Sequence, residues 1–380
     1  MKNLKIYPVN EIPELHFFGR NISDAGKRKF RTLFWNGSGF EVHFKGQELW
    51  ALVEAGYETL EPWVCVFLNG RINSRQMITK GLHWICLARG CDENYQSDIL
   101  FMKDSQPMSD DPKHFLKIHK LALSKGGSFK KCPVRNLKIE FIGDSITTGE
   151  GLAGAVNDMD WISSHMSFCQ TYAFQTAQKL NADFRVMSQG GYGIVSGWDN
   201  CPYKIIPPHY KNVCSIVKGQ LYEKLGGNEE YDFSLWQPHF VVVNLGTNDR
   251  GGFYMPSWKD NVSGIEYKMN LDESGKPCKK DGEKILTGVK NFLSVIRINN
   301  PDAKIIWATG FMQIPEVMEF IYKGIEQYRI ISGDKNIFTL EFESMDSEVE
   351  EEDKGSRGHP GPKTHRLATE KLCQVIKALS

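Results

Sequence analysis

The chain has 380 residues, and its 46 lysines and arginines balance 46 aspartates and glutamates. This length favours two domains with ordinary buried cores, because 41% of the residues are hydrophobic. The composition excludes a strongly basic nucleic-acid-binding protein, and no stretch approaches the roughly 18 apolar residues of a membrane span.

The first twenty residues, MKNLKIYPVNEIPELHFFGR, contain charges and prolines that interrupt every apolar run. A secretory signal needs an uninterrupted apolar core, so we expect a cytoplasmic protein. The nine cysteines are scattered, odd in number and without a CxxC pair. We therefore expect free thiols rather than disulfides or a metal site.

Residues 1–130 have the pattern of an all-β domain. Short apolar runs alternate with glycine and asparagine turns in RTLFWNGSGFEVHFKG, LWALVEAG, WVCVFLNGR, LHWICLARG and FLKIHKLAL. This spacing predicts a β-sandwich of jelly-roll type. The segment LSKGGSFKKCP, residues 123–133, is expected to be the loop between the domains.

Residues 134–380 change to alternating strands and helices. The strands are LKIEFIG, FRVMS, HFVVVNLG, AKIIWATG and NIFTLEF. The helices are TYAFQTAQKL, a stretch with Ile285, Val289, Phe292 and Ile296 at helical spacing, one beginning at Pro315, and a C-terminal helix with Ala368 and Leu372 on its apolar side. This alternation predicts an α/β domain with a mostly parallel sheet between helices. The acidic run DSEVEEED, residues 346–353, is expected to be a solvated loop.

The first α/β strand ends at Gly143-Asp144-Ser145, within FIGDSITTGEG. Ligands of parallel sheets bind beyond the carboxyl ends of the strands, so Ser145 is a candidate nucleophile. A serine at this position also suits a helix N-cap, and this fragment alone leaves both interpretations open.

Three further loops follow strand ends. SQGGYGIVSG contains Gly191 but fails the dinucleotide fingerprint, which gives no reason to expect that cofactor. VVVNLGTNDR supplies Asn248, whose amide can donate to an oxyanion, and Asp249, which is expected to tie down a loop. SRGHPGPKTH places His359 before Pro360 at a helix start.

The ordered motifs Gly-Asp-Ser, a glycine loop, Gly-Thr-Asn-Asp and His-Pro resemble those of the SGNH (GDSL) hydrolases. With the preceding strand-rich half and its FFGR motif, the chain resembles carbohydrate esterase family 2, whose members remove acetyl groups from xylan-type saccharides. The resemblance implies a nucleophile, Ser145, a base, His359, and an oxyanion hole formed by Ser145, Gly191 and Asn248. It implies no metal and no cofactor.

Tyr192 and Trp307 are candidate contacts for the sugar, although core packing explains each aromatic equally well. The resemblance implies an acetylated oligosaccharide as substrate. An O-acetyltransferase or a general short-chain carboxylesterase with the same site is the alternative. The N-terminal domain either binds glycan or shapes the cleft, and a homo-oligomer is compatible with the sequence.

One part of the SGNH pattern is missing. An aspartate commonly stands two or three residues before the histidine, but here Arg357 and Ser356 occupy those positions. We expect a backbone carbonyl near these residues to orient His359. Asp353 or Glu352 folding back, or an inactive protein, are the alternatives. His365 is expected on a helix surface.

Overall fold

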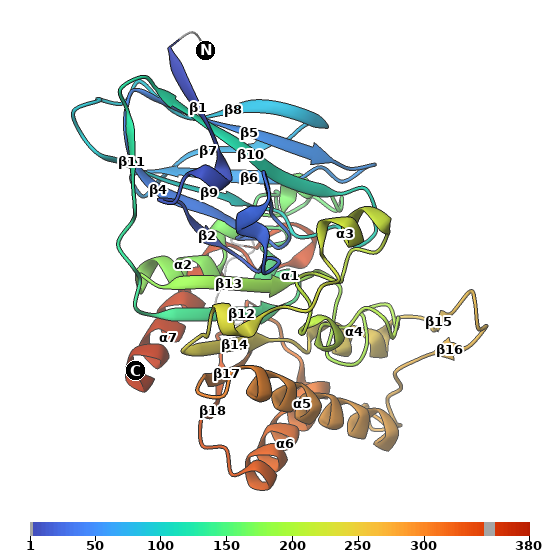
Figure 1. The fold of residues 1–380 in the computed structure, drawn as a ribbon. Coiled ribbons are helices and arrows are strands. Elements are labelled where there is room, and N and C mark those ends of the chain that lie inside the picture. The colour runs from blue at the N-terminus through green and yellow to red at the C-terminus, as the bar shows by residue number, and fades with distance from the viewer. Residues whose placement is uncertain (1–2, 346–353) are drawn as a thin grey trace.

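The computed structural model describes residues 3–345 and 354–380. The predicted acidic loop, with Glu352 and Asp353, lies outside these residues. The described chain forms an antiparallel β-sandwich followed by an α/β domain (Figure 1), and this confirms the predicted fold class.

Two antiparallel sheets make up the sandwich. The first has the order β1-β10-β5-β8, with β3 beside β10, and the second has the order β11-β4-β9-β6-β7, with β2 beside β4. Their bounds are β1 Leu4–Pro8, β2 His16–Phe18, β3 Arg31–Thr32, β4 Gly39–Lys45, β5 Glu48–Gly56, β6 Trp63–Leu68, β7 Arg71–Met77, β8 Gly81–Arg89, β9 Ser97–Lys103, β10 Phe115–Ser124 and β11 Ser128–Lys130. Strand β11 lies within the segment predicted to be a loop.

The second sheet is buried on both faces. Ile99 and Phe101 of β9 pack into the sandwich core, whereas Leu100 and Met102 pack against the α/β domain. Successive side chains of a strand point to opposite faces, so this one strand joins both cores. The two domains therefore share continuous apolar packing.

The α/β domain has a five-stranded parallel sheet of order β13-β12-β14-β17-β18. Its strands are β12 Lys138–Gly143, β13 Asp183–Ser188, β14 Phe240–Asn244, β17 Lys304–Thr309 and β18 Ile337–Glu341, and the short strands β15 Trp258–Lys259 and β16 Glu266–Tyr267 form a separate ribbon. The helices are α1 Ser145–Thr148, α2 Tyr172–Lys179, α3 Gln220–Leu225, α4 Thr247–Tyr254, α5 Lys279–Asn299, α6 Pro315–Ser332 and α7 Pro362–Leu379.

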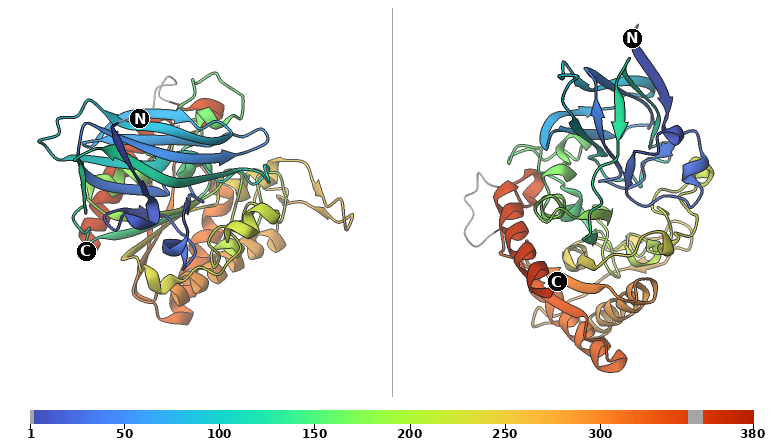
Figure 2. Two further views of the ribbon diagram at one scale, coloured as in Figure 1. Left: turned by 45° about the horizontal axis from the view of Figure 1, so that its top comes forward. Right: turned by 60° about the vertical axis from the view of Figure 1, so that its left-hand side comes forward.

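Helices cover both faces of the parallel sheet. Apolar residues of α5 and α6 pack on one face, and those of α2 and α7 pack on the other. The sandwich adjoins the edge strand β13 (Figure 1), and the views in Figure 2 place it at the end of the molecule opposite α5 and α6. No helix of the described residues is long and apolar enough to cross a membrane.

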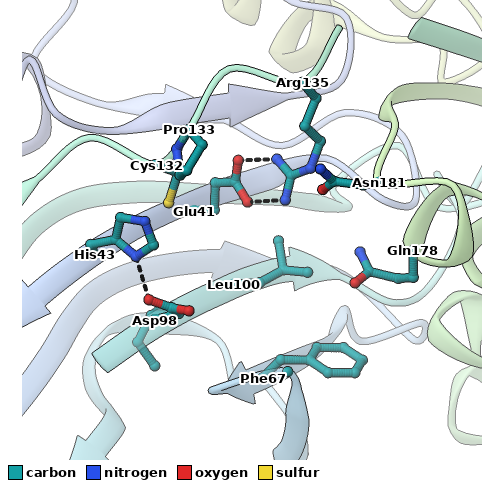
Figure 3. A pocket seen from close by; sticks show the side chains of 12 residues that line it. Glu41, His43, Phe67, Asp98, Leu100, Cys132, Pro133, Arg135, Gln178 and Asn181 are labelled. Carbon is teal, nitrogen blue, oxygen red and sulfur yellow. Dashed lines mark hydrogen bonds and ion pairs between the residues drawn. The ribbon is translucent and has the colours of Figure 1, made fainter. Parts of the chain in front are cut away.

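A cavity of about 320 Å³ opens at the junction of the domains (Figure 3). Arg135, in the segment between β11 and β12, makes a two-pronged ion pair with Glu41 of β4, and His43 pairs with Asp98. A guanidinium and a carboxylate pair most strongly in this two-pronged geometry. The connecting segment is therefore fastened to the sandwich where it leaves for the α/β domain.

A buried ion pair also joins the sandwich to the α/β domain. Arg20 donates from Nε and Nη2 to Glu140 Oε1 on β12, at 3.1 and 2.9 Å, and neither side chain is more than 3% exposed. The Tyr210 hydroxyl donates to Glu140 Oε2 at 2.6 Å, and the guanidinium stacks 4.5 Å from the Tyr210 ring centre. Both charges are thus fully partnered within the interface.

Arg20→Ala would leave the Glu140 charge buried without its partner. We expect the free energy of unfolding to fall by about 3–5 kcal/mol in denaturant titrations. Arg28→Ala is the matched control, because its ion-pair partners Asp24 and Glu229 are 52% and 49% exposed, and it should cost less than about 1 kcal/mol. Equal small losses for both variants would contradict this role of Arg20.

Candidate active site

Ser145 stands where the interior strand β12 passes into the short helix α1. Asp144 is the N-cap residue, since its carboxylate accepts from the Ile146 N–H at 3.0 Å. Ser145 is therefore the first residue of the helix and not its cap. Its Oγ lies 3.0 Å from His359 Nε2, within hydrogen-bond distance of the predicted base.

His359 lies between the 3-10 turn Ser356–Gly358 and α7. The Ser356 N–H donates to the Gly151 carbonyl at 3.1 Å, and this bond joins the histidine loop to the nucleophile loop. Gly151 has a φ of +84°, and a Cβ there would lie 2.6 Å from the Ser356 carbonyl oxygen. Only glycine allows the two loops to come this close.

The predicted oxyanion donors converge beside Ser145. Asn248 donates from Nδ2 to the Tyr192 carbonyl at 2.9 Å, which leaves the second proton of its amide for a ligand. Gly191 has a φ of +79°, and its N–H has no acceptor among the described residues. Ser145, Gly191 and Asn248 all line one cleft of about 510 Å³ together with His359.

Asp249 holds the glycine loop, as predicted. Its carboxylate accepts from the N–H groups of Ile194, Val195 and Ser196 at 2.8, 2.8 and 3.1 Å. Burial raises the pKa of Asp249 to about 6, even though these three hydrogen bonds act in the opposite direction. The side chain thus fixes the loop that follows β13.

The sandwich also supports this loop. Gln106, in the segment after β9, accepts from the Gly190 N–H at 2.7 Å, and Ser109 and Asp110 form part of the cleft wall. Only the tertiary fold brings this segment to the α/β domain, and the sequence carries no motif for it. Sequence reasoning therefore missed Gln106.

The predicted carbonyl acceptor for His359 is not present. Nδ1 of His359 is buried and has no hydrogen-bond partner among residues 3–345 and 354–380. Glu150 instead lies on the Nε2 side, with Oε1 3.8 Å from that nitrogen.

The position of His365 was also predicted wrongly. It is fully buried and accepts from the Tyr172 N–H at 3.0 Å, and burial lowers its pKa to about 3.

The two aromatic candidates have different positions. Tyr192 lines the cleft, although only 6% of it is exposed, and burial raises its pKa to about 12. Trp307 is completely buried, with its ring edge-on to Phe292 of α5, so the prediction that it contacts substrate is wrong. Its side chain points into the helix-covered core rather than toward the strand ends.

Two tryptophans that the sequence did not single out line the cleft instead, Trp161 and Trp198. Trp198 is 42% exposed, and its backbone N–H donates to the Gly191 carbonyl at 3.2 Å. Both follow the motif loops in polar surroundings, where an exposed aromatic is a weak signal for binding.

No group of three His, Cys, Asp or Glu side chains in the described parts of the chain could hold a metal ion.

A serine nucleophile, a histidine at 3.0 Å and converging amide donors at the ends of parallel strands define a serine hydrolase of the SGNH class. No family model matches the chain. Its structure is similar to that of an acetyl xylan esterase from the rumen bacterium Butyrivibrio proteoclasticus, with a TM-score of 0.94 and 37% identity over 99% of this chain and 98% of that chain. The chain belongs to carbohydrate esterase family 2.

Other relatives agree with this family. A family two carbohydrate esterase from Clostridium thermocellum, solved with cellohexaose, shares the fold at a TM-score of 0.76 and 24% identity, over 96% of this chain and 98% of that chain. A cellulase/esterase of Acetivibrio thermocellus is 25% identical over 97% of this chain and 40% of its own length. An acetylxylan esterase / glucomannan deacetylase of Cellvibrio japonicus is 29% identical over 52% of this chain and 49% of its own length. The chain thus spans less than half the length of these curated relatives.

Gln106→Leu would remove the acceptor of the Gly190 N–H and so loosen the oxyanion loop, the glycine loop that contains Gly190 and Gly191. We expect kcat for p-nitrophenyl acetate to fall roughly tenfold or more, with little change in KM, because misplaced donors stabilise the transition state less. Gln47→Leu, at an exposed hydrogen bond to Glu93 on the sandwich, is the control and should leave kcat unchanged. A wild-type kcat in Gln106→Leu would refute this role.

Proposed function

We propose that the protein is a serine esterase that removes O-acetyl groups from xylo-oligosaccharides or related acetylated sugars. The observation that carries this proposal is the 3.0 Å contact between Ser145 Oγ and His359 Nε2, in a cleft lined by Gly191 and Asn248. The likeness to the acetyl xylan esterase over 99% of the chain supports acetylated xylan as the substrate class.

The chemistry follows from this geometry. Ser145 Oγ attacks the acetyl carbonyl and gives its proton to His359 Nε2. The Ser145 and Gly191 N–H groups and the Asn248 amide stabilise the oxyanion, and one such donor typically contributes about 10²–10³ in kcat. His359 returns the proton to the departing sugar oxygen, and water, deprotonated by His359, then releases acetate from Ser145.

The two alternatives use the same site, and each differs from the deacetylase in one respect. An O-acetyltransferase would pass the acetyl group to a second sugar hydroxyl, and a general short-chain carboxylesterase would accept longer acyl groups. The predicted cytoplasmic location and homo-oligomer remain predictions.

Ser145→Ala removes the nucleophile, so release of acetate from acetylated xylan should fall by roughly 10³-fold or more. A series of p-nitrophenyl esters of rising chain length should show the highest kcat/KM for acetate. Thermal unfolding of the variant provides the folding control. A preference for butyrate, or transfer to added acceptor sugars in place of acetate release, would contradict the deacetylase proposal.

Trp198 is placed to stack on a sugar ring of the substrate. Trp198→Ala should raise KM for an acetylated xylo-oligosaccharide about tenfold, equivalent to about 1.4 kcal/mol, because the aromatic face is lost. KM for p-nitrophenyl acetate, which has no sugar, should stay the same, and Trp198→Phe should restore most of the binding. Equal effects on both substrates would indicate a disturbed oxyanion loop instead.

A further inference from the structure

Glu150 is a buried carboxylate in the cleft, five residues after the nucleophile. Its N–H donates to the Ser145 carbonyl at 3.0 Å, so its backbone is fixed to the nucleophile turn. Its side chain is 7% exposed, and Oε1 lies 3.8 Å from His359 Nε2. The other carboxylate oxygen, Oε2, lies beside the loop that contains Gly190 and Gly191, because a Cβ added to Gly190 would be 2.8 Å from it.

Arg357 holds this carboxylate. Its Nη1 donates to Glu150 Oε1 at 2.5 Å, and both residues line the cleft. The backbone of Arg357 has a φ of +57°, a left-handed conformation that is unfavourable for a residue with a side chain. Such backbone strain clusters at functional sites, and here it occurs two residues before the base.

His359 gains a positive charge when it takes the Ser145 proton, and the serine-hydrolase template places an acid on Nδ1 to compensate it. Here Nδ1 has no hydrogen-bond partner in the described parts of the chain. Of the described carboxylates, Glu150 alone lies within ion-pair distance of the ring, at 3.8 Å from Nε2. An opposite charge at this distance favours the protonated imidazole.

We propose that Glu150, held by Arg357, is a positioning residue that compensates the charge of the His359 imidazolium. It acts in place of the acid that the SGNH pattern puts before the histidine. In this step the Ser145 Oγ–H bond breaks and the His359 Nε2–H bond forms, with no proton transferred to Glu150. The positive guanidinium of Arg357 keeps Glu150 from taking the proton itself. It also counteracts the effect of the Glu150 charge on His359. This inference rests on the proposed function.

Other charged groups near the site are the same in every variant considered below. Burial raises the pKa of Asp144 to about 7 and that of Asp249 to about 6, and both lie beneath the cleft. His365 is neutral because burial lowers its pKa to about 3. The remaining charged groups of the cleft wall are Asp110, Lys204 and Arg250.

Two variants should change the charge balance around His359 in opposite directions. Glu150→Gln removes the negative charge, so the imidazolium is less favoured. Arg357→Gln removes the positive charge beside Glu150, so the imidazolium is more favoured. NMR of ring-labelled histidine measures both shifts without any substrate, with His359→Gln to assign the signal.

The pH dependence of kcat/KM should follow the same shifts. Hydrolysis needs neutral His359, so activity should rise with pH as the imidazolium of the free enzyme loses its proton. The acid limb should move to lower pH in Glu150→Gln, with kcat about tenfold lower, and to higher pH in Arg357→Gln. Arg357→Lys should restore the wild-type limb. Glu343→Gln, which removes a 64% exposed carboxylate paired with Lys371, is the control and should shift nothing.

Unchanged His359 titration in both charge-removing variants would overturn the proposal. A higher KM for oligosaccharide with an unmoved acid limb would overturn it as well, because Glu150 would then contact the sugar. If the opposite shifts occur but the wild-type protein releases no acetate, the proposed function fails while the electrostatic coupling stands. Should Glu150→Gln not fold, the upward shift in Arg357→Gln alone decides.

Discussion

The hydrogen bond between Ser145 Oγ and His359 Nε2 joins two residues 214 positions apart, and the proposed function depends on it. Parallel strands bring their carboxyl ends to one edge, so the loops after β12, β13 and β14 meet the loop before α7 there. Gly151 then allows the nucleophile and histidine loops to touch. A Cβ at Gly151 would lie 2.6 Å from the Ser356 carbonyl oxygen and 3.0 Å from the His359 Cβ, so the histidine loop would have to shift.

The sandwich belongs to this catalytic architecture. Asp104 accepts from the Cys169 N–H at 2.7 Å, and the neighbouring Ser167 N–H donates to the Gly149 carbonyl at 2.9 Å, at the end of α1. Gln106 reaches the Gly190 N–H on the other side of the nucleophile. Because these contacts and the wall residues come from the sandwich, its geometry favours a role in shaping the cleft over independent glycan binding.

Much of this could be predicted from the sequence, because alternating strands and helices fix which loops share an edge. The strands, the main helices and the loops that carry Ser145 and His359 follow from local periodicity, whereas the roles of these two residues are implied by the resemblance to the SGNH hydrolases. Side-chain direction is harder to predict. Trp307 lies two residues before the end of β17 and packs into the core, and His365 is on a helix side that packs inward. Glu150 lies within the first motif itself, but only the tertiary fold brings its carboxylate to 3.8 Å from His359 Nε2.

The central claim is that acetyl groups pass through Ser145. Rapid quenching of the enzyme with acetylated xylo-oligosaccharide, followed by mass spectrometry of its peptides, tests this most directly. We expect the mass of one acetyl group on the peptide that contains Ser145, and none on the same peptide of Ser145→Ala. Turnover without acetylation of this peptide, or with acetyl on another side chain, would contradict it.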